Sequence, residues 1–478
     1  MNPRDSRGST LRERILQRPA LVIGVLSTTS LLIYEILFRY FRPDALFSSN
    51  QLKTVPYLFQ TFASDDLMQT VKIEELTNFG PKGLWYFHIY PPLHEALLYV
   101  LALPNVLTNK PVTSEVVDLR LYVVYAIIFG LLNTLIFIWV RDLTRSARLG
   151  LIIVILWSIY PGNLQMATLV DGTYLSLYLT TLTFYFLYRF LRTRHAKYLT
   201  YWLISVAVTT YARPLFQWQV IVPVVLVVGL FVYMSRRTSR GWLVVIDVLM
   251  VGLILALPVK SYLMWGSFST TTYAGFHRTG MLYYDPPQDL YDAVQVPAGA
   301  LANAEVFKSA YNLPLLVTDN YAREQLANKW IASHSLNELS HVLVKSFNTN
   351  LQNALIPTSE YFPNHLSQDL PWRAPMDRIL SGYIYLLLGF GTVIAIFVMR
   401  GLRGTLGLLR RYGWLIAYYL MVAGTISIQN RNEWTEASRL KIFIEIPVWV
   451  AAAYLAHLVG LRLLHRKNRQ QSSKTQLQ

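Results

Sequence analysis

Long apolar stretches fill most of the chain, interrupted by two long polar segments and several short basic ones. A helix needs about 20 apolar residues to cross a bilayer. Runs of that length occur at 20–38, 119–140, 149–169, 173–191, 199–217, 219–235, 242–264, 379–399, 412–428 and 442–461. The pattern predicts an all-α polytopic membrane protein with about ten transmembrane helices.

Composition agrees with this class. Of the 478 residues, 53% are hydrophobic and only 15% are charged, whereas soluble domains carry about a quarter charged residues. The net charge of +16 would suit a nucleic-acid partner, but the basic residues fall in short runs beside apolar stretches, as in membrane topology signals. We therefore expect membrane lipids and no nucleic acid as partners. The chain has no cysteine, which excludes disulfides and thiolate chemistry.

The basic runs predict the orientation in the membrane. They lie at 4–18, 141–148, 189–197, 236–240, 400–411 and 462–474, and they include only three of the 27 acids. Positively charged connections stay in the cytoplasm, so both termini, 1–19 and 465–478, are predicted to be cytoplasmic tails. The absence of any Asn-x-Ser/Thr sequon favours a bacterial or archaeal cytoplasmic membrane.

One apolar segment has to be left out of the spans for this orientation to hold. Residues 93–107 are short, contain His94 and Glu95, follow Pro92 directly and include Pro104. We interpret them as an interfacial or re-entrant helix that completes one extracytoplasmic loop.

The predicted organisation follows from that choice. A transmembrane module covers 20–265 and includes the outer loop 40–118. A second extracytoplasmic segment covers 266–378, and C-terminal helices cover 379–464. Within the second segment, residues 319–354 show amphipathic helical periodicity.

Polar residues of the first outer loop are the first candidates for a site. They are Asp65, Asp66, His88, Tyr90 and His94. The acidic pair also fits a solvated turn or a helix N-cap. The histidines fit hydrogen-bonded interfacial residues better than metal ligands, because no third ligand has suitable spacing. We predict no metal or other cofactor, although adjacent acids are also a ligand type for divalent cations.

Later outer turns add Asp171, Arg213, Glu436 and Arg439. Each has a simpler interpretation. Asp171 suits a helix cap, Arg213 can reach lipid headgroups along its apolar stem, and Glu436 with Arg439 suits a surface ion pair. Glu445 lies inside a predicted span near Arg439 and Lys441, so we expect it to orient one of those cations.

The order of these residues resembles the GT-C glycosyltransferases, especially the bacterial branch similar to protein O-mannosyltransferases and lipid A aminoarabinose transferases. In that family an acidic pair precedes a Pro-Pro-Leu motif, as Asp65-Asp66 precedes Pro91-Pro92-Leu93 here. Asp171 and Arg213-Pro214 resemble an acid after the third helix and a basic residue before a proline. Glu436, Arg439 and Glu445-Ile446-Pro447 resemble the C-terminal element.

The resemblance implies a GT-C-like fold in which the module 20–265 is catalytic, and it also implies a function. Family members move a sugar from a polyprenyl-phosphate donor to an extracytoplasmic hydroxyl of a lipid, glycan or protein, with inversion. Asp65 or Asp66 would be the general base, with Asp65 favoured. Cationic side chains would stabilise the leaving phosphate.

One position departs from the family. Aminoarabinose transferases have a lysine before Pro-Pro-Leu, where this chain has Tyr90. Arg213, Arg439, Arg431 or Lys441 would then bind the donor phosphate. The alternatives are a transporter or lipid flippase, a non-catalytic GT-C-like scaffold, and a polymerase or ligase of envelope polysaccharides.

Overall fold

The computed structural model describes residues 19–41, 71–169, 171–213, 241–307, 314–354, 382–429 and 440–475, and α-helix is the regular structure throughout these ranges. Within them, Ser114–Thr144, Val245–Trp265, Gly391–Ile426 and Ile442–His465 are long and apolar enough to cross a membrane. A bent helix pair adds a fifth candidate. The expectation of an all-helical fold is therefore confirmed for the described residues, and the long apolar helices are those of a membrane-integral protein, while the number of ten spans stays a prediction.

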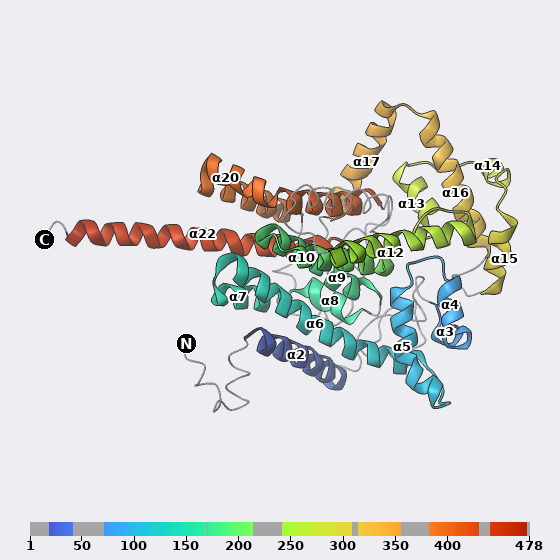
Figure 1. Ribbon diagram of the computed structural model, residues 1–478, viewed down its shortest axis with the longest axis horizontal. Helices are drawn as coiled ribbons and strands as arrows, with labels where there is room; N and C mark the ends of the chain where they lie inside the picture. Colours follow the sequence, from blue (N-terminus) through green and yellow to red (C-terminus); the bar gives the residue numbers. More distant parts are fainter. Residues whose placement is uncertain are drawn as a thin grey trace.

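The long helices form a bundle around α6 (Ser114–Thr144), which packs against α2, α7, α9 and α22 (Figure 1). The other bundle helices are α2 (Pro19–Phe41), α7 (Ala147–Ser158), α8 (Pro161–Thr168), α9 (Thr173–Thr193), α10 (Ala196–Ala212), α12 (Gly241–Trp265), α20 (Gly382–Gln429) and α22 (Ile442–Thr475). The predicted span 219–235 lies outside the described residues.

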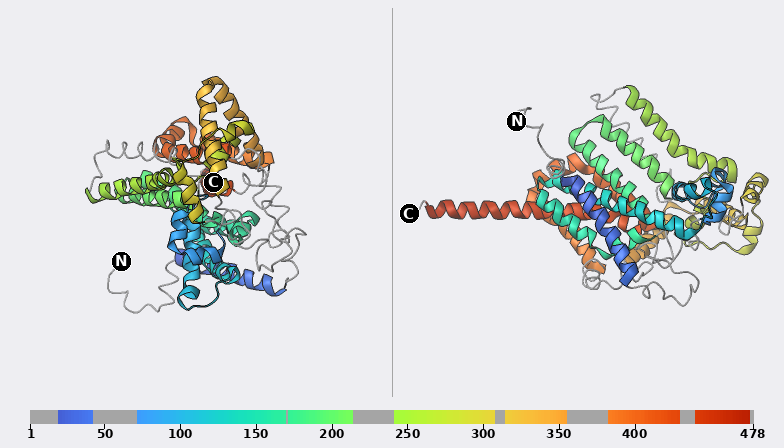
Figure 2. Two further views of the ribbon diagram at one scale, coloured as in Figure 1. Left: turned by 90° about the vertical axis from the view of Figure 1, so that its right-hand side faces the viewer. Right: turned by 90° about the horizontal axis from the view of Figure 1, so that it is seen from below.

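Two groups of shorter helices cover one end of the bundle, which we call the loop end (Figure 1). They are α3 (Ile73–Phe79), α4 (Pro81–Tyr86) and α5 (Leu93–Leu107), and α13 (Ala274–Met281), α14 (Gln288–Asp292), α15 (Ala298–Val306), α16 (Pro314–Ser333) and α17 (Leu336–Ala354). The two segments that the charge pattern assigns to one side of the membrane thus lie at one end of the molecule. The C-terminal part of α22 extends beyond the opposite end (Figure 2).

The predicted span 149–169 is not a straight helix. α7 and α8 meet at an angle of 63°. Tyr160 between them has an extended backbone, and Pro161 at the start of α8 has no N–H to continue the α7 hydrogen bonds. The Trp157 carbonyl, four residues before this proline, accepts from Tyr160 N at 3.2 Å and from the side-chain amide of Asn163 at 3.0 Å.

Two other segments also differ from the sequence expectation. The stretch 319–354 is divided, because α16 ends at Ser333 and α17 begins at Leu336. Ser335 and Glu338 form reciprocal hydrogen bonds there, Ser335 N to Glu338 Oε2 at 2.8 Å and Glu338 N to Ser335 Oγ at 3.3 Å. This is a capping box that starts a new helix. α22 continues to Thr475, so most of the predicted tail 465–478 is helical.

α20 combines the predicted spans 379–399 and 412–428, but Gly401 has a non-helical backbone with φ 64° and ψ 172°. Glycine adopts this conformation without a Cβ clash. The Met399 carbonyl before the kink accepts from Arg462 at 2.7 Å, and Arg411 after it donates to the Arg192 carbonyl at 3.3 Å. Both sides of the kink therefore contact helices at the end of the bundle opposite the loop end, which we call the basic end.

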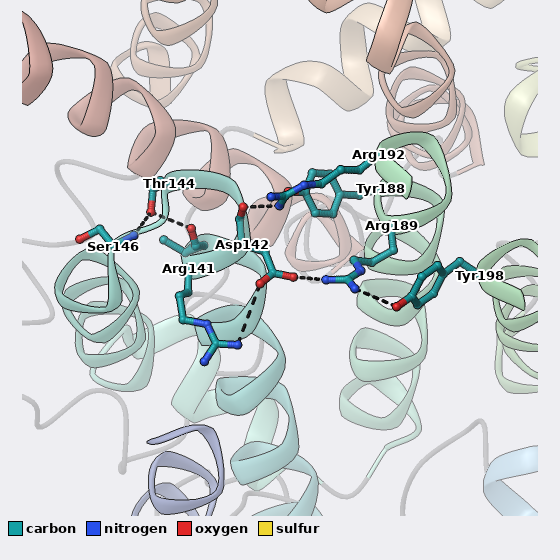
Figure 3. Close-up of polar contacts among 9 residues, drawn as sticks. Arg141, Asp142, Thr144, Ser146, Tyr188, Arg189, Arg192 and Tyr198 are labelled. Atoms are coloured by element: carbon teal, nitrogen blue, oxygen red, sulfur yellow. Dashed lines mark hydrogen bonds and ion pairs between the residues drawn. The ribbon is translucent and has the colours of Figure 1, made fainter. Parts of the chain in front are cut away.

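A single acid joins three helices at the basic end (Figure 3). The Asp142 carboxylate of α6 accepts a hydrogen bond from Arg189 of α9, and the Asp142 carbonyl accepts one from Arg192. Arg189 also donates to the Tyr198 hydroxyl of α10 at 2.7 Å. These cations lie near the C-termini of α6 and α9, where the helix dipole favours positive charge.

Small residues allow α2 to approach α6 closely. Thr134 Oγ1 donates to the Ala20 carbonyl at 3.1 Å. A Cβ added to Gly130 would lie 2.5 Å from the Gly24 carbonyl oxygen. Helix pairs in membranes depend on such contacts, because burial of apolar surface gives little driving force there.

We expect Gly130→Ala to lower the apparent melting temperature of the purified protein in detergent. The added methyl group has to push α2 away, and overpacking of this kind costs about 1–3 kcal/mol. Gly252→Ala is the matched control, since a Cβ there has no neighbour within 4 Å. Equal melting temperatures for the two variants would contradict the close packing of α2 on α6.

Candidate functional site

The first outer loop is tied to the end of α12 and to the segment that follows it. Three consecutive backbone carbonyls of the loop accept hydrogen bonds from these residues. Phe87 accepts from Lys260 Nζ at 3.1 Å, His88 from Thr272 N at 2.9 Å, and Ile89 from Thr271 Oγ1. Residues about 180 positions apart in the sequence are thereby held together at the loop end.

His88 is buried within this junction, with 4% of its surface exposed. Its Nδ1 lies 2.6 Å from Thr272 Oγ1, and its ring centroid lies 4.6 Å from that of Trp265. Burial, with a smaller contribution from the charge of Lys260, lowers the pKa of His88 to about 3. His88 is therefore neutral at ordinary pH and is hydrogen-bonded, as the simpler interpretation of this residue expects.

Tyr90 stacks on Tyr273, with ring centroids 6.3 Å apart. The two prolines that follow supply no N–H, and α5 begins directly after them at Leu93. His94 in the first turn of α5 packs against Gly172, where an added Cβ would lie 3.1 Å from the His94 Cβ. The first turn of α5 therefore rests on the turn that carries Asp171.

Asp171 and Arg213 form a buried ion pair between that turn and the end of α10. Arg213 Nη2 lies 2.7 Å from Asp171 Oδ2, and the two side chains are 5% and 3% exposed. Asp171 also accepts from Thr173 N at 2.9 Å at the start of α9, while the Tyr125 hydroxyl donates to the Asp171 carbonyl at 2.6 Å. Asp171 thus supports the start of α9 and pairs with Arg213, whose guanidinium is buried in the protein and does not extend toward lipid headgroups.

The position of Arg213 follows from its neighbour in the sequence. It precedes Pro214, and a residue before proline avoids helical backbone angles. Arg213 is extended, with φ −150° and ψ 140°, so α10 ends at Ala212. Because the helix ends there, Arg213 reaches Asp171 and does not continue α10.

Glu95 lies close enough to Arg213 to be affected by its charge, and the sequence analysis did not propose it as a site residue. It is 1% exposed, and its Oε2 has no hydrogen-bond partner among the described residues. Burial raises the pKa of Glu95 to about 8, against the opposing effects of a backbone hydrogen bond and the charge of Arg213. The available signal was a glutamate beside His94 at the start of an apolar helix, which we used only to exclude a span.

A second buried ion pair lies at the start of α22. Lys441 Nζ is 3.6 Å from Glu445 Oε1, and the Tyr160 hydroxyl donates to the same oxygen at 3.2 Å. Of the two cations that Glu445 was expected to orient, the structure thus places Lys441 beside it.

The predicted site is only partly described. Asp65, Asp66, Glu436, Arg439 and Arg431 lie outside the described residues. Of the predicted residues that are described, Asp171 and Arg213 are in direct contact, His94 packs against the turn beside them, and His88 and Tyr90 lie in the preceding loop. Within the described ranges, no three His, Asp or Glu side chains gather as a metal site.

No protein-family model, curated protein or solved structure matches the chain. The arrangement at the loop end therefore has to be interpreted from its own chemistry. It offers buried cations, a neutral histidine and a protonated carboxyl group close to an apolar bundle.

The raised pKa of Glu95 predicts how stability depends on pH. The folded protein holds this proton more tightly than the unfolded chain, so stability falls as pH rises from about 4.5 to about 8, by about 1.4 kcal/mol per pH unit. We expect Glu95→Gln to weaken this dependence in melting curves recorded between pH 5 and 8. Glu115→Gln, at an exposed position of α6, should keep the wild-type slope. Parallel curves for all three proteins would contradict the buried, protonated state.

The burial of the Asp171–Arg213 ion pair predicts that loss of Asp171 destabilises the protein far more than loss of a more exposed acid. Asp171→Asn leaves a buried guanidinium without its counter-ion and should destabilise the protein by about 3 kcal/mol or more. Asp319→Asn breaks the more exposed ion pair between Asp319 and Arg323 and should cost about 0–1 kcal/mol. Melting temperatures in detergent provide the comparison, and similar losses in both variants would refute the burial of the Asp171 pair.

Proposed function

We propose that the chain is a GT-C-type membrane glycosyltransferase with about ten spans. It would move a sugar from a polyprenyl-phosphate donor to an extracytoplasmic hydroxyl of a lipid, glycan or protein, with inversion at the sugar carbon. In this proposal Asp65 or Asp66 is the general base, both termini are cytoplasmic, and the loop end faces outward.

One observation carries the proposal. The loop that bears Tyr90-Pro91-Pro92-Leu93 is held by α12 and packs through His94 against the turn of the Asp171–Arg213 pair. Three motifs from separate parts of the sequence, which the resemblance assigns to one site, are thus neighbours at one end of an apolar bundle.

The chemistry needs few groups. One positioned carboxylate removes the acceptor proton. The departing lipid phosphate is already a stable anion, so it needs cations and hydrogen-bond donors and no general acid. In the described part of the site, Arg213 and Lys441 each lie within 4 Å of a carboxylate, at 2.7 Å and 3.6 Å. Their charges are thus largely balanced, and in the proposal they support the frame of the site.

A proton-coupled transporter is the second candidate, and Glu95 is the observation that favours it. A buried carboxyl group with a pKa of about 8 beside an ion pair is the kind of group that proton relays use. The two candidates differ in the first outer loop, because transport by way of Glu95 does not need the Asp65-Asp66 pair.

The decisive variants are Asp65→Asn and Asp66→Asn. We expect one of them to lower transfer from a polyprenyl-phosphate sugar by at least 100-fold with unchanged expression, because general-base catalysis contributes about 10²–10⁴-fold. Unused lipid-linked sugar should accumulate in cells that carry this variant, as measured by mass spectrometry.

Asp289→Asn, at an exposed position in the second outer segment, is the control and should retain activity. Full activity in both loop variants would exclude the acidic pair as the base. An unchanged lipid profile in a deletion strain would favour the transporter.

A further inference from the structure

Lys260 is a cation that neither the sequence interpretation nor the proposed mechanism uses. It lies five residues before the end of α12, at the loop end, and is partly buried. Its Nζ donates to the Phe87 carbonyl at 3.1 Å and lies 5.4 Å from the centroid of the Trp85 ring. In the part of the chain that the structure describes, no carboxylate lies within ion-pair distance of it. An ammonium group has three N–H donors, and the Phe87 carbonyl occupies one of them.

His88 supplies a second polar group beside this lysine. Its Nε2 is buried and has no hydrogen-bond partner among the described residues. The His88 carbonyl already accepts from Thr272 N at 2.9 Å, and the Thr272 hydroxyl lies 2.6 Å from Nδ1 but 3.3 Å from that carbonyl. The Thr272 hydroxyl therefore donates to Nδ1, and the ring hydrogen is carried by Nε2, which can act as a donor.

The surroundings of Lys260 are those of a membrane interface. The neighbouring residues Val259, Tyr262 and Leu263 of α12 are 42%, 58% and 76% exposed, so this face of the span meets lipid in a bilayer. Trp85, beside the ammonium group, is 58% exposed. Exposed tryptophan and tyrosine at the end of an apolar helix are typical of the headgroup level, where the abundant anions are phosphate groups.

We propose that Lys260 and His88 form a subsite for a phosphate group carried by a lipid. The ammonium group supplies the charge, and the imidazole Nε2–H supplies a neutral hydrogen bond. Two lipids carry this chemistry, namely an anionic phospholipid and a polyprenyl phosphate. The second source depends on the proposed function, since it would be the donor or the released carrier.

A purely structural role for Lys260 makes a different prediction. If Lys260 only donates to the Phe87 carbonyl, a neutral donor should replace it. Lys260→Gln keeps a donor and loses the charge, Lys260→Arg keeps both, and Lys260→Met loses both. Lys82→Met removes a nearby exposed lysine of α4 and is the matched control.

His88 permits an equally specific pair of variants. In His88→Asn the amide nitrogen takes the place of Nδ1, so the contact with Thr272 is kept and the Nε2 donor is lost. In His88→Gln the amide nitrogen takes the place of Nε2. Ligand binding through Nε2 therefore predicts loss in the Asn variant and retention in the Gln variant. If His88 serves only the contact with Thr272, His88→Asn should be the more stable of the two variants, and both should bind the lipid equally well.

The test is native mass spectrometry of the full-length protein in detergent micelles, titrated separately with sugar-free polyprenyl phosphate, phosphatidylglycerol and neutral phosphatidylcholine. We expect Lys260→Met, Lys260→Gln and His88→Asn to lose about tenfold or more in affinity for at least one phosphate lipid, because a hydrogen bond to a charged group has this worth. Lys260→Arg, His88→Gln and Lys82→Met should stay within about threefold of wild type.

The two anionic lipids identify the source of the phosphate. Loss confined to polyprenyl phosphate assigns the carrier lipid, and loss confined to phosphatidylglycerol assigns a phospholipid headgroup. Wild-type affinity of Lys260→Met and Lys260→Gln for both, in proteins that melt like wild type, would overturn the subsite. Binding is measured without sugar or acceptor, so a failure of the transferase assay leaves this result unaffected, and a failure here leaves the assignment of the base open.

Discussion

The buried pairing of Asp171 with Arg213 is the constraint on which the loop end depends. Neither charge is stable alone in an apolar bundle, since an uncompensated buried ion costs several kcal/mol. The pair therefore fixes the distance between the turn before α9 and the extended residue that ends α10. α5 then rests on that turn through His94 and Gly172, so the first outer loop takes its position from the same interaction.

The hydrogen bonds around Phe87, His88 and Ile89 complete this arrangement from the other side. Lys260, Thr271 and Thr272 hold the loop against the end of α12 and the segment after it, so the loop has contacts with both halves of the chain. The basic end is organised differently. There one acid, Asp142 of α6, accepts hydrogen bonds from two arginines of α9. Positive charge exceeds negative charge at this end, as the positive-inside rule expects for a cytoplasmic side.

Ionisation separates the groups at the loop end into two kinds. His88 and Glu95 are held in their neutral forms, because burial penalises the charge of each. Arg213 keeps its charge with a counter-ion, whereas Lys260 has no such partner among the described residues. A neutral histidine next to a cation provides both a donor and a charge without repulsion between them, which is what recognition of a phosphate requires.

The sequence by itself determined the class of the protein and the ends of many helices. Apolar length predicts helices that cross a membrane, and prolines mark breaks such as the start of α5 after Pro92 and the end of α10 before Pro214. Only the tertiary structure decided which polar groups meet. Glu95 and Lys260 each lie in an apolar stretch of the sequence, and the sequence records neither their burial nor their partners. The bend at Tyr160 and the break at Ser335 have local causes, Pro161 at the first and the capping box of Ser335 and Glu338 at the second, within stretches whose apolar or amphipathic pattern continues across them.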